Sequence, residues 1–278
     1  MKFGLTIAGS DSGAGAGVQE DLKTFTMLGV YCATVITSIT AQNTYEVAEV
    51  FNLPPSIVSA QIDAVMRDLP IMYGKTGMLG NTEIVEVVCS KVDEYGLKLV
   101  VDPVMISKSG ARLLSEDAVK TLGDRLLPRA LLITPNIPEA SVLSGVAIRS
   151  WEDMEEAADI LLSSGCSYVV IKGGHLDGET VRDLFCSTST RRWFEYRRVH
   201  TKNNHGAGCT LSSAVAAELA KGRPPLVAYA KARRFLQRAL ERSLNIGRGH
   251  GPLNPMYNLP GFRVNNERSY TRDWSAGY

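Results

Sequence analysis

The chain has 278 residues, of which 45% are hydrophobic and 21% are charged, and its formal net charge is +1. This is enough apolar material for a sizeable core, and the balanced charge gives no reason to expect nucleic acid or an anionic membrane as a partner. We expect neither a membrane-spanning segment nor a signal peptide, because the apolar runs are too short. The five cysteines are scattered without a Cys-x-x-Cys pair, which predicts a reducing, cytoplasmic location and no disulfides.

Short apolar runs alternate with amphipathic segments along the chain. Strands are expected at residues 3–8, 34–39, 97–101, 131–134 and 168–171, and one or two antiparallel strands within 183–199. Helices are expected after the glycine-rich loop 13–17, after Pro54-Pro55, from Asn81 to Gly96, and from a capping box at Ser150 and Asp153 to Gly165.

This alternation predicts an α/β fold with a mostly parallel sheet covered by helices on both faces. No Gly/Ser/Pro-rich linker divides it, so we expect one domain over residues 1–260 and a loose polar tail over 261–278. Polar residues follow several strands, and ligands bind at the carboxyl ends of strands in such sheets. The clusters are Gly9-Ser10-Asp11, Gln42-Asn43, Asp102-Pro103, Asn136 with Glu139, and Lys172-Gly173-Gly174.

Residues 201–222 carry the most informative stretch of the chain. Gly206 and Gly208 precede an alanine-rich, helix-favouring run that Gly222 is placed to end. The free N–H groups and the dipole of a helix start bind an anion, most often a phosphate, and favour the thiolate of Cys209 on the first turn. The residues alone leave a second interpretation open, a glycine-started helix with a buried, inert cysteine.

Two standard nucleotide-binding motifs are absent. Gly74-Lys75-Thr76 imitates the end of a P-loop, but Leu69 stands where the upstream glycine is required. Gly13-x-Gly15 imitates the dinucleotide fingerprint, but the third glycine position is Val18. The loop 13–17 is therefore interpreted as a turn on the substrate side.

Across residues 5–254 the chain resembles the hydroxymethylpyrimidine/phosphomethylpyrimidine kinases of thiamine biosynthesis, within the ribokinase-like superfamily. The motifs that carry this resemblance are Ile7-Ala8-Gly9-Ser10-Asp11-Ser12-Gly13, Asp21-Leu22-Lys23-Thr24-Phe25, Ala41-Gln42-Asn43-Thr44, Lys75-Thr76-Gly77-Met78-Leu79, Asp102-Pro103-Val104-Met105, Thr134-Pro135-Asn136, Lys172-Gly173-Gly174-His175, and His205-Gly206 with Gly208-Cys209-Thr210-Leu211-Ser212. The chain departs from the family pattern at Ala14, where glycine is usual, and at Asn204 and Ala207, where threonine is common.

The resemblance implies a ribokinase-like, three-layer α/β/α fold and an ATP- and Mg²⁺-dependent kinase. The implied substrates are 4-amino-5-hydroxymethyl-2-methylpyrimidine and its monophosphate, and relatives suggest a homodimer. Two alternatives stay open at this stage: a pyridoxal/pyridoxine kinase of the same superfamily, and a catalytically silent pyrimidine-binding sensor.

The resemblance also implies catalytic roles. The amides of Gly206, Ala207, Gly208 and Cys209 would hold the transferring phosphoryl group, and Lys172 would reach the ATP phosphates. Cys209 would take the place of the aspartate base of sugar kinases, either accepting the alcohol proton or orienting the alcohol.

The remaining assignments are weighed against ordinary structural roles. Glu139 and Asp102 would help to place Mg²⁺, although Asn136 and Glu139 also fit a plain capping box and Asp-Pro is a common turn opener. The nucleotide side would include Lys172, Asn136, Asp183, Thr201 and Lys202. The pyrimidine side would include Gly9, Ala16, Asp21, Gln42, Met78 and Val104, with a core methionine and a solvated first-turn carboxylate as the structural alternatives for Met78 and Asp21.

Overall fold

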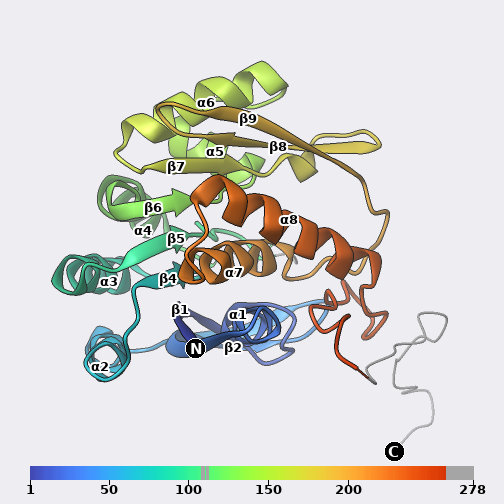
Figure 1. Cartoon of the computed structure of the whole chain (residues 1–278). Helices are drawn as coiled ribbons and strands as arrows, with labels where there is room; N and C mark the ends of the chain where they lie inside the picture. The colour runs from blue at the N-terminus through green and yellow to red at the C-terminus, as the bar shows by residue number, and fades with distance from the viewer. Residues whose placement is uncertain (108–109, 111–112, 261–278) are drawn as a thin grey trace, which may run out of the picture.

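The computed structural model describes residues 1–107, 110 and 113–260 of the chain, and the predicted tail over 261–278 lies outside them. A single sheet runs through the whole described chain, with helices on both sides (Figure 1). Its nine strands are β1 (Lys2–Asp11), β2 (Val30–Gln42), β3 (Val47–Asn52), β4 (Tyr73–Thr76), β5 (Lys98–Val101), β6 (Ala130–Ile133), β7 (Tyr168–Ile171), β8 (Thr180–Cys186) and β9 (Arg191–Arg197).

The strand order is β3-β2-β1-β4-β5-β6-β7-β8-β9. The strands from β2 to β7 in this order are parallel, whereas β3, β8 and β9 pair antiparallel to their neighbours. The carboxyl ends of the central strands therefore meet at one edge of the sheet, as the sequence predicted for a ligand site.

The helices form two layers, one on each face of the sheet. They are α1 (Gly17–Met27), α2 (Pro55–Met66), α3 (Thr82–Tyr95), α4 (Glu116–Thr121), α5 (Ile137–Ser144), α6 (Trp151–Ser163), α7 (Ala207–Ala220) and α8 (Pro225–Glu241), with short helical turns η1 (Leu122–Leu126), η2 (Leu127–Arg129) and η3 (Gly173–His175). One apolar core packs α2 to α6 against the sheet, and a second packs α1, α7 and α8 against the other face.

Alternate side chains of the central strands contribute to the two apolar cores on opposite faces of the sheet. In β5, Leu99 and Val101 face the first core, while Val100 between them faces the second. Successive side chains of a strand point to opposite faces, so strands buried on both sides read as continuous apolar runs. This burial on both faces agrees with the doubly covered sheet that the alternation of strands and helices predicted.

Most of the predicted elements are confirmed, with strand and helix ends shifted by a few residues. Asn81 caps α3 and Gly96 ends it at φ 60°, and Ser150 with Asp153 forms the predicted capping box of α6. The segment 183–199 forms the antiparallel strands β8 and β9. Strands β3 and β4 and helices α4 and α8 were not predicted.

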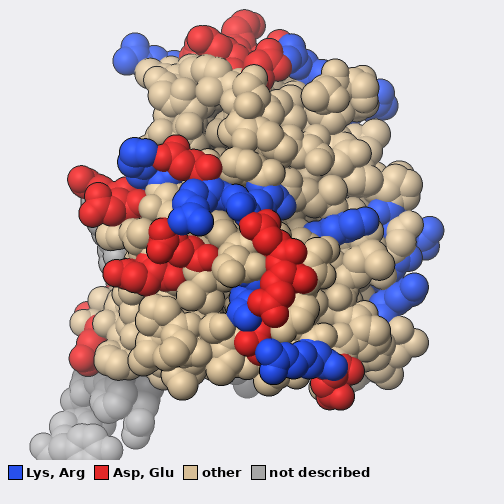
Figure 2. All heavy atoms as spheres, turned by 90° about the vertical axis from the view of Figure 1, so that its left-hand side faces the viewer, with Lys and Arg blue, Asp and Glu red and all other residues tan. Residues whose placement is uncertain are grey.

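The surface opposite the ligand edge carries charges of both signs. Figure 2 shows basic and acidic side chains interspersed on this face, with no large area of one sign. Ion pairs such as Arg125 with Glu86 and Arg129 with Asp93 contribute to this pattern. No helix among residues 1–107 and 113–260 combines the length and apolar character needed to cross a membrane.

Candidate active site

A cavity of about 610 Å³ opens at the carboxyl ends of the parallel strands, between the start of α7 and the loops that follow β1, β5, β6 and β7. This volume is typical of small-molecule sites. Of the residues predicted for the site, the cavity is lined by Gly9, Ala16, Gln42, Met78, Asp102, Val104, Asn136, Glu139, Lys172, Asp183, Gly206, Ala207, Gly208 and Cys209. Residues far apart in the sequence are thus brought to one place.

The start of α7 forms one wall of the cavity. Gly206 precedes the helix at φ 85°, and a Cβ there would lie 1.9 Å from the carbonyl oxygen of Gly15, so only glycine fits. The Ala207 amide donates to the Asn204 carbonyl at 3.3 Å, and the first i to i+4 bond runs from Thr210 to Gly206. The amides of Gly208 and Cys209 belong to the first turn, which has no intrahelical acceptors, and they face the cavity.

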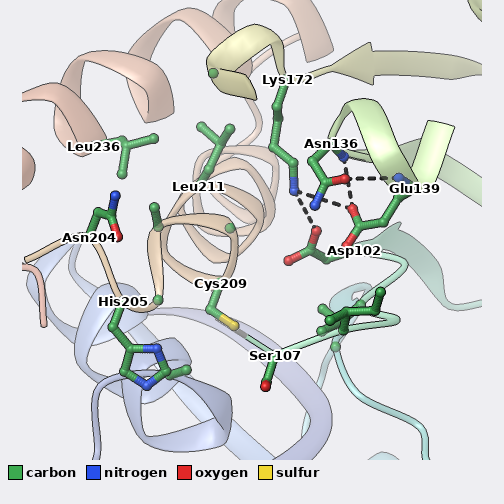
Figure 3. Close-up of a pocket in the computed structure, with 18 of the residues that line it drawn as sticks. Asp102, Ser107, Asn136, Glu139, Lys172, Asn204, His205, Cys209, Leu211 and Leu236 are labelled. Atoms are coloured by element: carbon green, nitrogen blue, oxygen red, sulfur yellow. Dashed lines mark hydrogen bonds and ion pairs between the residues drawn. The ribbon is translucent and has the colours of Figure 1, made fainter. Parts of the chain in front are cut away.

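Three charged side chains meet beside this helix start. Lys172 Nζ lies 2.8 Å from Asp102 Oδ1 and 4.0 Å from Glu139 Oε2. A Cβ on Gly208 would lie 3.2 Å from Asp102 Oδ2 and 3.4 Å from Lys172 Nζ, so the charged pair lies directly against the first turn of α7. Figure 3 shows Lys172, Asp102 and Glu139 pointing toward one another next to Cys209.

Burial and the attraction between opposite charges shift the pKa values of Lys172 and Glu139. Burial alone would lower the pKa of Lys172, but Asp102 and Glu139 outweigh it and raise the pKa. Burial raises the pKa of Glu139 to about 7, against the opposing effect of Lys172. Lys172 is therefore a fixed positive charge on the cavity wall.

Asn136 and Glu139 form a complete capping box at the start of α5. The Asn136 side chain accepts from the Glu139 amide at 2.9 Å, and Glu139 Oε2 accepts from the Asn136 amide at 2.8 Å. The structural alternative weighed for this pair is thus present. It fixes the Glu139 carboxylate at the cavity rim and does not prevent a second role there.

Burial of the Cys209 thiol opposes the thiolate that the helix start was predicted to favour. Burial raises its pKa to about 12, while Lys75 acts in the opposite direction and the Asp21 and Asp102 carboxylates reinforce the rise. The cost of desolvating a sulfur anion exceeds the stabilisation from Lys75 and the Gly17 amide. At neutral pH the residue is a protonated thiol on the cavity wall.

Asp21 does not line the cavity, which corrects its predicted contact with the pyrimidine. The side chain is fully buried and accepts from Thr6 Oγ1, Ser213 Oγ and Lys75 Nζ at 2.6, 2.6 and 2.9 Å. It joins α1 to β1, β4 and α7 beneath the site. Neither a ligand contact nor a solvated carboxylate describes it.

The predicted nucleotide residues divide into two groups. Thr201 and Lys202 lie outside the cavity lining, and Thr201 Oγ1 instead contacts Ser243 Oγ at 3.1 Å. Asp183 lines the cavity, but its oxygens accept from the Gly173 amide, Tyr229 and Arg233 at 2.9, 2.7 and 2.8 Å. Asp183 therefore fixes the position of the peptide group that follows Lys172.

Close packing at the other end of the cavity explains one of the predicted small residues, Gly9. A Cβ on Gly9 would lie 3.1 Å from the Met78 sulfur, so the glycine leaves room for that side chain. Ala16 lines the cavity at the end of the loop 13–17. Ala14 in this loop has φ 57° and is the non-glycine residue with positive φ among those described, at a position where glycine would avoid strain.

Sequence reasoning gave no role to Asp11 and His205, which both line the cavity. His205 Nε2 lies 3.0 Å from Asp11 Oδ2 and 3.3 Å from Gln42 Nε2. Their positions, at the end of β1 and just before Gly206, were the available signal. Helix α8 was also missed, although Ala228, Ala232 and Leu236 repeat at helical spacing and Leu236 reaches the cavity.

The donor set fits a magnesium ion held mainly through water. Asp102 and Glu139 supply hard carboxylate oxygens at the rim, and Mg²⁺ typically uses one or two carboxylates together with waters and substrate phosphates. Within the described part of the chain no group of three or more His, Cys, Asp or Glu side chains forms a closed metal cage.

The chain is similar to known kinases over nearly its whole length. It is 47% identical over 253 residues to the hydroxymethylpyrimidine/phosphomethylpyrimidine kinase of Rhizobium meliloti, covering 90% of this chain and 95% of the relative. It is 48% identical over 252 residues to the thiamine biosynthesis bifunctional protein ThiED of Geobacter sulfurreducens, covering 90% of this chain and 51%, about half, of that longer protein.

The fold is shared with solved structures. The ADP complex of the Bacillus subtilis pyridoxal kinase superposes with a TM-score of 0.86 at 38% identity, covering 92% of this chain and 98% of that chain. This confirms the ribokinase-like α/β fold. The family model for phosphomethylpyrimidine kinase matches residues 11–254, and the chain therefore belongs to the phosphomethylpyrimidine kinase family.

Proposed function

We infer that this chain is an ATP-dependent kinase that phosphorylates the hydroxymethyl group of 4-amino-5-hydroxymethyl-2-methylpyrimidine, and then phosphorylates the resulting monophosphate to the diphosphate. The observation that carries this inference is the meeting of Lys172, Asp102 and Gly208 at the start of α7, in a cavity that also holds Gln42 and Met78. The groups that would neutralise phosphate charge and the residues that would bind the acceptor alcohol thus line the same cavity. The names of the curated relatives favour this function over a pyridoxal kinase or a silent sensor.

Phosphoryl transfer requires positioning and charge stabilisation more than covalent chemistry, because its transition state is loose. The amides of Gly208 and Cys209 and the dipole of α7 are oriented before the reaction and offset the charge on the equatorial oxygens. Lys172 adds a positive charge beside this first turn, and Asp102 holds its ammonium group by a 2.8 Å hydrogen bond.

Magnesium, when bound with ATP, would be held at the rim by Asp102 and Glu139 and would supply further neutralisation of phosphate charge. The capping box keeps the Glu139 carboxylate aimed at that place. Because burial raises the Glu139 pKa to about 7, this side chain gains its full charge only above neutral pH or next to a cation.

Cys209 is proposed to orient the acceptor hydroxyl. A thiol with a pKa of about 12 is not an anion before the reaction, but its sulfur can accept a hydrogen bond from the alcohol. The alcohol proton becomes acidic only as the new O–P bond forms, so a weak acceptor in the right place is sufficient.

We also propose that the protein is a cytoplasmic homodimer. All five cysteines are free thiols, which suits a reducing compartment. Edge strand β3 and its neighbour β2 expose Phe51, Val50 and Ile39 at 62%, 41% and 51%, and such an apolar edge invites pairing with a second copy.

The experiment that tests the activity measures ADP release with ATP, Mg²⁺ and one acceptor at a time. Release is expected with the hydroxymethylpyrimidine and with its monophosphate, and much more weakly with pyridoxal or ribose. Binding of the pyrimidine without ADP release would support the sensor instead, and preferred turnover of pyridoxal would support the pyridoxal kinase.

A further inference from the structure

The segment that follows α8, residues 243–254, has no part in the roles described above (red in Figure 1). It includes Gly247-Arg248-Gly249-His250-Gly251, with glycine at alternate positions. The structure describes all twelve of its residues, and none of them lines the cavity. The segment nevertheless contacts both the turn between β2 and β3 and residues 201–205, which lead into α7. We call residues 243–254 the strap and residues 201–205 the lead-in.

The strap holds the lead-in by hydrogen bonds. His250 Nδ1 lies 3.0 Å from the Lys202 carbonyl oxygen, and the Gly251 amide donates to Asn203 Oδ1 at 3.2 Å. The His205 amide donates to the Gly251 carbonyl at 3.1 Å. A Cβ on Gly251 would lie 2.4 Å from Asn203 Oδ1, so this close approach requires glycine. The lead-in is therefore fixed by the strap up to the start of α7.

The strap is also fixed to Thr44, two residues beyond Gln42. The Thr44 carbonyl accepts from the His250 amide at 2.8 Å, and Thr44 Oγ1 accepts from the Gly249 amide at 3.1 Å. A Cβ on Gly249 would lie 2.2 Å from the Thr44 carbonyl oxygen, so a larger residue cannot approach in the same way. The strap thus joins the turn after β2 to the lead-in.

The lead-in depends on contacts of this kind for its position. It contains no helix or strand of its own, and irregular segments move more easily than the elements they connect. Asn204 and His205 line the cavity, and Gly206 at φ 85° follows them directly. A shift of the lead-in would therefore move the first-turn amides of α7 relative to the carboxyl end of β2.

We propose that the strap is a positioning element for phosphoryl transfer, in which Thr44, Gly249 and Gly251 set the start of α7 relative to the carboxyl end of β2. The proposal rests on the proposed kinase function. The first-turn amides of α7 belong to the phosphoryl side of the cavity, and β2 ends at the acceptor side. Misplacement of reacting groups by about 1 Å can lower a rate by about a hundredfold.

This role predicts an effect on kcat rather than on KM. The reaction requires the two sides of the cavity at a fixed spacing, whereas each side binds its own ligand at either spacing. A loosened strap therefore removes an alignment that matters in the transition state and leaves ground-state binding in place.

The first test measures kcat and KM for ADP release with the hydroxymethylpyrimidine. Thr44→Val removes the acceptor of the Gly249 amide and keeps a branched side chain. It should lower kcat by about tenfold, the effect of one hydrogen bond, and change either KM by less than about twofold. Thr44→Ser keeps the hydroxyl and is the matched control, which should retain kcat. Thr44 belongs to neither apolar core, so these variants should fold.

Gly249→Ala is a stronger change, because its Cβ would push the strap away from the Thr44 carbonyl. It should lower kcat by about a hundredfold. Gly123→Ala, in η1, is the control for adding a Cβ. There the new atom would meet Leu143 Cδ2 at an ordinary 3.8 Å, and kcat should not change.

A second measurement requires neither turnover nor substrate. Native-state hydrogen exchange follows the His205 amide, which donates to the strap, and the Thr210 amide, which donates to the Gly206 carbonyl at 2.8 Å and closes the first turn of α7. Both amides should exchange about tenfold faster in Thr44→Val than in the unmodified protein. Unchanged exchange at Thr210 would overturn the positioning role.

Failure of this role can be told apart from failure of the proposed function. Unchanged kcat in both Thr44→Val and Gly249→Ala would overturn the role of the strap and leave the kinase assignment in place. A loss in Thr44→Ser equal to that in Thr44→Val, or a change confined to KM, would also overturn it. No ADP release by the unmodified protein with either pyrimidine would overturn the proposed function, and hydrogen exchange would still decide whether the strap holds the start of α7.

Discussion

At the scale of single residues, Cys209 is a position where a substitution should affect turnover without affecting nucleotide binding. The thiol lies on the cavity wall, but the backbone amides beside it are independent of the side chain. We predict that Cys209→Ala lowers kcat by about a hundredfold, within the range for one positioned catalytic group, and changes ATP affinity less than twofold. Steady-state kinetics together with nucleotide-binding calorimetry check this.

The matched control for this variant is Cys166→Ala, which removes a buried thiol whose sulfur contacts the carbonyl of Leu161. It should leave kcat unchanged. Because the pKa of Cys209 is raised to about 12, the rate of the unmodified enzyme between pH 6 and 9 should show no step due to the thiol. Near-normal turnover in Cys209→Ala would remove the thiol from the mechanism.

Ala14 is a residue whose cost to the fold can be measured. It adopts φ 57°, where Cβ crowds the backbone, and its amide and carbonyl are held by Asp11 and Lys23. We predict that Ala14→Gly raises stability by about 0.5–1 kcal/mol, since the relief of strain exceeds the added freedom of the unfolded chain. Thermal denaturation measures the effect, and Ala158→Gly, inside helix α6, should do the opposite.

At the scale of elements, Glu20 makes the packing of α1 on α7 sensitive to pH. Its side chain is fully buried, accepts from Thr210 Oγ1 at 2.7 Å and pairs with Lys23 Nζ at 2.6 Å. Burial, the largest influence, raises its pKa from 4.5 to about 7. The folded state therefore holds a proton that the unfolded state has released between these two values, and stability falls as the pH rises through this window.

Glu20→Gln should remove this dependence. Between pH 4.5 and 8 the free energy of unfolding of the variant should gain up to roughly 3 kcal/mol relative to the unmodified protein. Thr210→Val keeps the Glu20 carboxyl but removes the hydroxyl that donates to it, a contact that lowers the Glu20 pKa. The free energy of unfolding of this variant should therefore fall more steeply as the pH rises. Urea denaturation at pH 4.5 and pH 8 measures the free energy of unfolding of each protein. If the difference between Glu20→Gln and the unmodified protein is the same at both pH values, the assignment of the pH dependence to Glu20 is contradicted.

The elements that the sequence predicted correctly are those whose signals are local. Asn81 and Gly96 mark both ends of α3 by capping geometry, and β5 is a continuous apolar run. Strand β4 was missed because Gly74-Lys75-Thr76 has no strand pattern, and Lys75 is buried only through its long-range pairing with Asp21. Tertiary contacts, which no local window contains, override propensity there.

The same difference between local signals and long-range contacts applies to the candidate site. Glycines and strand-end polar residues identified where the cavity forms, because their backbone requirements are visible in the sequence. The raised pKa of Cys209 and the burial of Asp21 were not visible in the sequence, because both depend on desolvation by distant segments. His205 and Asp11 are adjacent only after the chain folds, 194 positions apart in sequence.

At the scale of the whole molecule, strand β2 belongs both to the ligand site and to the exposed edge of the sheet. Thr40 and Gln42 of β2 line the cavity together with residues at the carboxyl ends of the other parallel strands and with Leu236 of α8. The exposed apolar residues Ile39 and Phe51 are paired in register between β2 and β3, at the end of the sheet. Of these residues, Phe51 is exposed and does not line the cavity, so a change there tests assembly.

We predict that Phe51→Lys converts the proposed homodimer into a monomer without unfolding it. A lysine on an edge strand is a common device against pairing, and the side chain it replaces is 62% exposed, so no core contact is lost. Light scattering coupled to gel filtration measures the mass of each species. Ile160→Lys, at an apolar position 42% exposed on α6, is the control and should leave the dimer intact. A monomeric unmodified protein, or a dimer that persists in Phe51→Lys, would exclude this edge as the interface. We expect Phe51→Lys to retain kcat, because Phe51 does not line the cavity.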